Sequence, residues 1–352
     1  MHEEHRNEQH QATKVQSQVA PRNPAAATQE IIEQDPAKSD GIDRRNFLSC
    51  MAWAGTGLVW TVAGGVPTSR LFAATTGTAG AKSTGIHSSG SFSFVQISDS
   101  HIGFNKAANQ DVTATLKLAL DKINRLPVTP DLLLHTGDIT HSSKLAEFDT
   151  AQQLIKSAKA DETFYVPGEH DTAMDDGAVY RERFGKGTLG SGWYSFTHKG
   201  VHFIGLNNVL QIDAMGRLGA DQLKWLKADL APLSSSTPIV IFAHIPLWMV
   251  YPDWGWGTKD GEEALSYLKR FGSVTVLNGH IHQVVQKVEG NVAFHTATST
   301  AFPQPAPGKA PSAGPMVVPA GKLKSVLGIT EVKYIGRHSH LAIVDSSLEE
   351  MV

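Results

Sequence analysis

Seven histidine and carboxylate side chains stand at the ends of five apolar runs in this sequence, where they could bind metal ions. Such short runs, rich in β-branched and aromatic residues, are typical of buried strands. In α/β sheets, functional groups collect where the strands end, so we expect the seven side chains to meet in one crevice. They are Asp99, His101, Asp138, Glu169, His244, His280 and His282.

The number and type of these groups predict the kind of ion. Asp99 and His101, like His280 and His282, are two residues apart, so both members of a pair can reach one ion. Carboxylates mixed with imidazoles suit zinc, iron or manganese better than copper or calcium. Seven groups are too many for one ion, but they suit two ions about 3.5–4 Å apart if one carboxylate bridges them. One such motif alone would be typical of a core histidine or a capped turn.

Strands and helices alternate in the segment that must position these groups. A helical period is present at 109–125, 144–160 and 219–233. The alternation, followed by a half made of strands, predicts α/β layers with two sheets flanked by helices. The expected strands lie at 92–101, 130–141, 163–168, 238–246, 273–282, 292–300 and 340–347, with a hairpin at 193–208 that turns at Lys199-Gly200.

Composition excludes some other functions. The chain has 352 residues and a net charge of −3, which argues against a nucleic-acid partner bound through phosphate contacts. Its one cysteine, Cys50, precedes the predicted strands, so we expect no disulfide and no thiolate ligand in the folded domain.

The N-terminal segment resembles an export signal. Residues 1–42 are polar and are expected to be disordered. Arg44 and Arg45 precede Phe-Leu and a short apolar stretch that ends near residue 66, as in twin-arginine signals. The alternative is an exposed arginine pair beside a short buried helix. The stretch is too short and too rich in glycine for a membrane span, so we expect none in the mature protein.

This interpretation divides the chain into three parts. Residues 1–81 are the disordered N-terminus and signal peptide, 82–91 a linker, and 92–347 the folded domain with a Pro-rich loop at 302–321. The twin-arginine (Tat) export machinery would be a partner, and the mature protein would be periplasmic or otherwise outside the cytoplasm.

The order of the motifs along the chain resembles that of a known family. D-x-H, G-D, G-x-H-D, a histidine after a strand, and G-H-x-H together resemble the calcineurin-like metallophosphoesterases over about residues 92–300. The resemblance implies two mixed β-sheets packed as a sandwich and flanked by helices, in four α/β/β/α layers. It also implies hydrolysis of a small-molecule phosphoester, either a phosphomonoester or a phosphodiester.

Carried onto this chain, the resemblance implies roles for the candidate residues. One ion would be held by Asp99, His101 and His282, and the other by Glu169, His244 and His280, with Asp138 bridging. The ions would be iron, manganese or zinc, both divalent or of mixed valence. His170 would protonate the leaving group or stabilise the transition state, with Asp171 as the carboxylate that orients it.

Glu169 departs from the family pattern, which has asparagine at this position. Glutamate can bind a metal through oxygen, but it adds a negative charge and lacks an N–H donor. Three carboxylates around two divalent ions leave a net charge of about +1, which attracts a phosphate less and acidifies bound water less. Three interpretations follow. The site could select a more highly charged ion pair, or it could act on a phosphodiester or have a slow turnover. Alternatively, it could have lost most of its catalysis.

Two functions of different class remain open from the sequence. The first is an exported metal-dependent phosphoesterase, and the second is a metal- or ligand-binding sensor module with little or no turnover. The pair His170 and Asp171 favours the enzyme, because a binding module does not need it.

Two loops and two asparagines could also contribute to the site. Residues 248–260 hold three tryptophans and a tyrosine, which could pack among themselves or form an aromatic wall over the metals. Residues 302–321 are too rich in proline for a helix or strand, and a flexible excursion is favoured over a lid. Asn207 or Asn208 could lie near the site.

Overall fold

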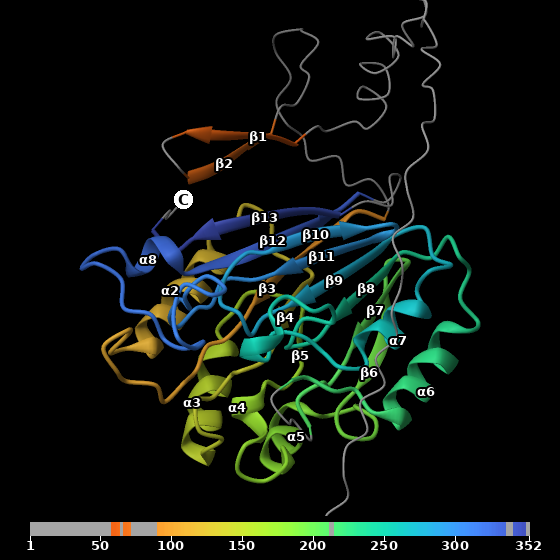
Figure 1. The fold of residues 1–352 in the computed structure, drawn as a ribbon, viewed down its shortest axis with the longest axis horizontal. Helices are drawn as coiled ribbons and strands as arrows, with labels where there is room; N and C mark the ends of the chain where they lie inside the picture. The colour runs from red at the N-terminus through yellow and green to blue at the C-terminus, as the bar shows by residue number, and fades with distance from the viewer. Residues whose placement is uncertain (1–57, 64–65, 72–89, 211–214, 336–340, 350–352) are drawn as a thin grey trace, which may run out of the picture. The chain divides into compact units, whose positions relative to one another are not determined.

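The computed structural model describes residues 58–63, 66–71, 90–210, 215–335 and 341–349, and the chain forms two compact units (Figure 1). In the first unit, Met1–Ser83, strands β1 (Leu58–Ala63) and β2 (Val66–Leu71) pair as an antiparallel hairpin. Arg44 and Arg45 lie outside the described residues, so the predicted export signal stays a prediction.

The second unit, Thr84–Val352, contains two mixed sheets. The first sheet has the strand order β13-β12-β3-β4-β5. Strand β3 is parallel to β4 and β4 to β5, whereas β12 is antiparallel to both β3 and β13. The strands are β3 (Phe92–Ile97), β4 (Leu132–His135), β5 (Glu162–Tyr165), β12 (Gly328–Tyr334) and β13 (Leu341–Ser347).

The second sheet has the strand order β10-β11-β9-β8-β7-β6, with four parallel strands between two antiparallel edge strands. The hairpin β6–β7 turns at Lys199 and Gly200, as predicted, and both have positive φ (46° and 85°), as a type I′ turn requires. The strands are β6 (Tyr194–His198), β7 (Val201–Gly205), β8 (Ile239–Phe242), β9 (Val274–Asn278), β10 (Gln286–Glu289) and β11 (Val292–Thr296).

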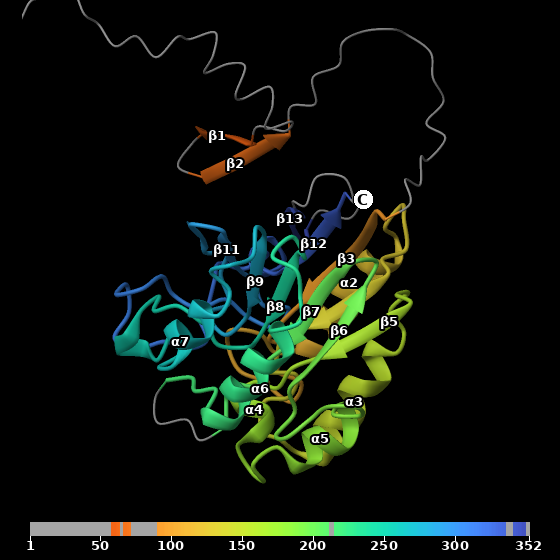
Figure 2. The same cartoon turned by 90° about the vertical axis from the view of Figure 1, so that its right-hand side faces the viewer.

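Helices cover the outer faces of the two sheets (Figures 1 and 2). Helices α2 (Val112–Asn124) and α3 (Leu145–Ile155) bury their apolar faces against the first sheet, and α6 (Ala220–Leu230) and α7 (Gly261–Ser266) bury theirs against the second. The remaining helices are short: α4 (Glu169–Thr172), α5 (Ala178–Phe184), α8 (Leu323–Val326) and a 3₁₀ turn at Pro252–Trp254.

A third apolar cluster fills the space between the sheets. It joins Phe94 and Leu134 of the first sheet to Phe203 and Phe242 of the second, and the exposure of all four is 0%. The layers are therefore helix, sheet, sheet and helix, which confirms the predicted fold class. Among the described residues, none of the helices combines the length and the apolar character that a membrane crossing needs.

Candidate active site

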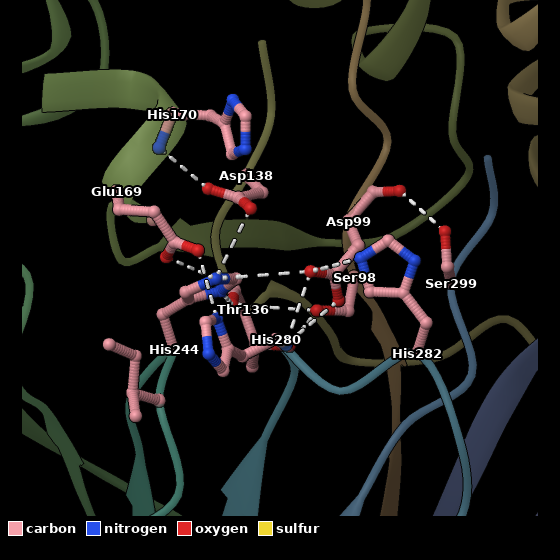
Figure 3. Close-up of polar contacts among 12 residues, drawn as sticks. Ser98, Asp99, Thr136, Asp138, Glu169, His170, His244, His280, His282 and Ser299 are labelled. Atoms are coloured by element: carbon pink, nitrogen blue, oxygen red, sulfur yellow. Dashed lines mark hydrogen bonds and ion pairs between the residues drawn. The ribbon is translucent and has the colours of Figure 1, made fainter. Parts of the chain in front are cut away.

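The seven predicted ligands come from both sheets and lie together where their strands end, and Figure 3 shows all of them except His101. On the first sheet, Asp99 and His101 follow β3, Asp138 follows β4, and Glu169 is the first residue of α4 after β5. On the second sheet, His244 follows β8, while His280 and His282 follow β9. The parallel strands of both sheets end at the same edge. Candidate ligands that are far apart between positions 99 and 282 of the sequence therefore lie close together in space.

The ligands form two groups, as the resemblance implied. In the first group, Nε2 of His282 lies 3.2 Å from Oδ1 of Asp99 and 3.3 Å from Nε2 of His101. In the second, the two carboxylate oxygens of Glu169 lie 2.9 Å from Nε2 of His244 and 2.9 Å from Nδ1 of His280.

Asp138 lies between the two groups. Its Oδ2 is 3.5 Å from Nε2 of His101 and 3.4 Å from Nε2 of His244. One carboxylate oxygen thus faces a histidine of each group, which is the position of a bridging ligand. Its other oxygen accepts a hydrogen bond from the backbone N–H of His170 at 2.9 Å.

The donor atoms have the properties of metal ligands. Nε2 of His244 and Nδ1 of His280 are buried and face the two carboxylate oxygens of Glu169 at 2.9 Å, so these donor atoms all point into the cluster. The far ring nitrogens are engaged: Nδ1 of His244 pairs with the carbonyl oxygen of Thr136 at 2.7 Å, and Nδ1 of His282 with that of Phe302 at 2.5 Å. Metal-binding histidines are oriented in this way, so the residues present fit transition-metal ions.

The backbone is strained at the ligands. Asp99, His101, Asp138, His280 and His282 have φ between 42° and 69°, a left-handed conformation that side chains other than glycine rarely adopt. Such strain is concentrated at functional sites, where the surrounding structure holds it. The neighbouring glycines permit close approach: a Cβ on Gly168 would lie 2.0 Å from Oδ1 of Asp138.

The carboxylates and histidines of the site shift one another's pKa values. Burial alone would raise the pKa of Asp99, but the neighbouring His282 and His244 lower it to about 2. Burial would also raise the pKa of Glu169, but His280 and His244 hold it well below its usual value. Burial and the neighbouring histidines keep the pKa of His101 low. The carboxylates of Asp99 and Glu169 are therefore charged at neutral pH and available to cations.

His170 and Asp171 do not form the pair that was expected. The carboxylate of Asp171 accepts hydrogen bonds from the backbone of Ile139, Thr140 and Gly168 and from the hydroxyl of Thr140, at 2.8–3.1 Å. The ring of His170 is held instead at Nδ1, 2.7 Å from the carbonyl oxygen of His141. Asp171 thus ties the loop after β4 to the start of α4, and its expected role as the orienting carboxylate is corrected.

Burial would lower the pKa of His170, but the nearby carboxylates of Asp138 and Glu169 raise it. A histidine that retains its proton beside the cluster can donate it to a leaving group. Cations bound to those carboxylates would weaken this effect, because they neutralise the charge that causes it.

Comparison with known proteins gives the family. The sequence model of the calcineurin-like phosphoesterases matches residues 92–284, which include all seven ligands. The chain belongs to the calcineurin-like phosphoesterase family. It is a hydrolase of phosphoester bonds in a metal-dependent family, as the sequence predicted.

Relatives of this calcineurin-like phosphoesterase differ in their named substrates. A "probable cyclic nucleotide phosphodiesterase" of Vesicomyosocius okutanii is 27% identical over 216 residues, 60% of this chain and 87% of the relative. A "serine/threonine-protein phosphatase" of Danio rerio is 27% identical over 224 residues, 55% of this chain and 71% of the relative. Among solved structures, GAP50 of Plasmodium has the same fold, with a TM-score of 0.50 and 13% identity over 74% of this chain and 86% of that one.

The walls of the phosphoesterase cavity come from the two loops singled out in the sequence. The cavity has a volume of about 380 Å³ and is lined by aromatic side chains and by five of the seven candidate ligands, His101, Asp138, Glu169, His280 and His282. The aromatic loop supplies Trp254 and Trp256, whereas Trp248 packs against Phe294 in the core. Within the loop, the ring of Trp254 lies edge-on to those of Tyr251 and Trp256, so the loop both packs on itself and lines the cavity.

The Pro-rich loop also forms part of the wall. Phe302, Gln304 and residues 313–315 line the cavity, and Nε2 of Gln304 donates to the carbonyl oxygen of His280 at 2.9 Å. The favoured interpretation of this loop as an excursion away from the site was wrong for these residues. Sequence reasoning missed them because the loop carries no periodic or charged pattern.

Asn207 and Asn208 lie outside the cavity lining. Their side chains bond to backbone of Ser191 and Ile245, so their role is structural. Two lining residues carried too little signal in the sequence to be assigned a role, Lys106 and His141.

Proposed function

We propose that this protein is an exported phosphodiesterase that uses two transition-metal ions. The observation that carries the proposal is the position of Asp138, whose Oδ2 faces one histidine of each ligand group at 3.4–3.5 Å. A single-ion site would leave three or four buried donor atoms without a role. We assign Asp99, His101 and His282 to one ion, Glu169, His244 and His280 to the other, and Asp138 to both.

The bound ions and His170 would have separate roles in the reaction. Two bound ions would activate water and neutralise charge on the phosphoryl oxygens. His170 lines the cavity and would donate a proton to the leaving oxygen. Its Nδ1 is fixed by the His141 carbonyl, so Nε2 is the ring atom left for the substrate.

The charge of the ligand shell favours a diester over a monoester. Asp99, Asp138 and Glu169 bring three carboxylates within 4 Å of one histidine, His244. Two divalent ions then leave about +1, which matches the single negative charge of a phosphodiester better than the two of a monoester. The name of the Vesicomyosocius relative supports the same substrate class.

The metal content tests the two-ion site. We expect about two iron, manganese or zinc ions per chain by elemental analysis after expression in metal-replete medium. A content near zero that added metal does not restore would refute the proposal.

The substrate class is tested with metal-reconstituted protein. We expect faster hydrolysis of a chromogenic phosphodiester than of the matching phosphomonoester. A protein that binds two ions but hydrolyses neither would instead be the sensor module, and a strong preference for the monoester would overturn the charge argument.

Export through the twin-arginine route is also proposed, supported by Arg44, Arg45 and the apolar stretch behind them. Replacing both arginines by lysine should leave the precursor in the cytoplasm. Periplasmic protein at an unchanged level in cell fractions would refute this route.

A further inference from the structure

His141 contacts both a proposed metal ligand and the proposed acid. Its Nδ1 lies 3.3 Å from Nδ1 of His101, and its ring stacks on His170 with centroids 4.9 Å apart and planes 17° apart. Its carbonyl oxygen holds Nδ1 of His170 at 2.7 Å. The residue is half-buried and lines the cavity.

The position of the proton on His141 follows from the metal site, so this inference rests on the proposed function. His101 faces the ligand groups through Nε2. When Nε2 binds an ion, the proton of the ring is on Nδ1. The only described partner of that N–H is Nδ1 of His141, which must therefore accept. A neutral imidazole that accepts at Nδ1 carries its own proton on Nε2.

Nε2 of His141 then carries a hydrogen-bond donor on a ring that lines the cavity. None of the described residues hydrogen-bonds to this nitrogen. Glu169 brings no N–H donor to the site, so a phosphoryl oxygen that is not held by the ions needs a donor from elsewhere. His141 and His170 can both supply one from their stacked rings.

We propose that the Nε2–H of His141 donates a hydrogen bond to a phosphoryl oxygen of the bound substrate. His141 is then a substrate-binding residue of this phosphoesterase, held in the correct tautomer by His101. A hydrogen bond to a charged oxygen changes affinity by about 10- to 100-fold.

Two substitutions separate substrate binding from a structural role. In His141→Asn the amide oxygen replaces Nδ1 as acceptor for His101, and nothing replaces Nε2. In His141→Gln the longer amide places an N–H near the position of Nε2. Both variants keep the backbone carbonyl that holds His170. His198→Asn is the matched control, because His198 pairs with Asp131 away from the cavity.

The readouts are metal content by elemental analysis and the dissociation constant for inorganic phosphate by calorimetry on the metal-loaded proteins. We expect all variants to retain two ions. His141→Asn should bind phosphate about 10- to 100-fold more weakly than wild type, and His141→Gln within about threefold of it.

Three results would overturn the inference: unchanged phosphate binding in His141→Asn, an equal loss in both variants, or loss of the ions from His141→Asn. The proposed function fails separately, if wild-type protein binds no metal or hydrolyses no phosphoester.

Discussion

Replacing Glu169 by asparagine tests how the charge of the ligand shell selects the substrate. The carboxylate lies between His244 and His280, 2.9 Å from a nitrogen of each. Glu169→Asn removes one negative charge and adds an amide N–H. With two divalent ions the net charge of the shell rises from about +1 to about +2.

The size of the effect follows from Coulomb's law. At an effective dielectric constant of about 20, two unit charges about 6 Å apart interact by roughly 3 kcal/mol. The cavity is open to water, so we expect about half of this to remain for the extra charge of a monoester. That is about 1.4 kcal/mol, or a tenfold faster hydrolysis of a chromogenic phosphomonoester with Mn²⁺ or Zn²⁺. The diester should gain less, because it carries one charge fewer.

The assay compares wild type with Glu169→Asn on both substrates across a set of metals. Glu169→Gln is the matched control, because it removes the charge but keeps the length that reaches both histidines. With a ferric ion at one position, wild type already has the higher charge, so the advantage of the variant should shrink. If both variants are slower on the monoester with every metal, Glu169 is a ligand or base that this enzyme requires.

Four other predictions concern the remaining residues. Asp138→Asn should abolish activity and lower the metal content, because Asp138 faces both ligand groups; two ions bound at wild-type affinity would contradict its bridging position. His170→Ala should keep both ions while turnover falls by roughly 10²–10⁴, and a collapse of its metal content would show that it is a ligand. Asp171→Asn places an amide opposite three backbone donors and should lower the free energy of unfolding by about 2–4 kcal/mol. The melting temperature should then fall by roughly 5–15 °C. An unchanged melting temperature would refute the role of Asp171 in tying the loops together. A chelator should lower the melting temperature of wild type more than that of Asp138→Asn, because only wild type gains the full binding energy of the ions.

The convergence of the seven candidate ligands could be predicted from the sequence because each of them follows an apolar run. Runs such as the one before Asp138 indicate both a buried strand and the point where it ends. Strand ends of one sheet meet at one edge, so the convergence of the seven side chains followed from general rules. The helix expected at 109–125 could be predicted from its period, and Leu116, Leu120 and Ile123 are buried on the apolar side of α2.

The parts that the sequence did not predict depend on contacts between distant segments. Strand β10 has four exposed residues and little apolar pattern, so its pairing with β11 is visible only in the structure. The role of Asp171 depends on backbone donors about 30 residues away, and the tautomer of His141 depends on His101 across 40 residues. No local pattern encodes such partners.

The place of β12 in the first sheet has a consequence for how the protein folds during synthesis. Strand β3, which leads to Asp99 and His101, has β12 as one of its two neighbours, with Gln96 opposite Thr330. More than 200 residues separate the two strands, and contacts of such long separation form slowly. The ribosome must therefore pass residue 334 before the sheet beneath the first candidate ligands can close. The candidate ligands from the second sheet are made earlier than β12, so the pocket that holds all seven side chains is complete only after β12 has been made.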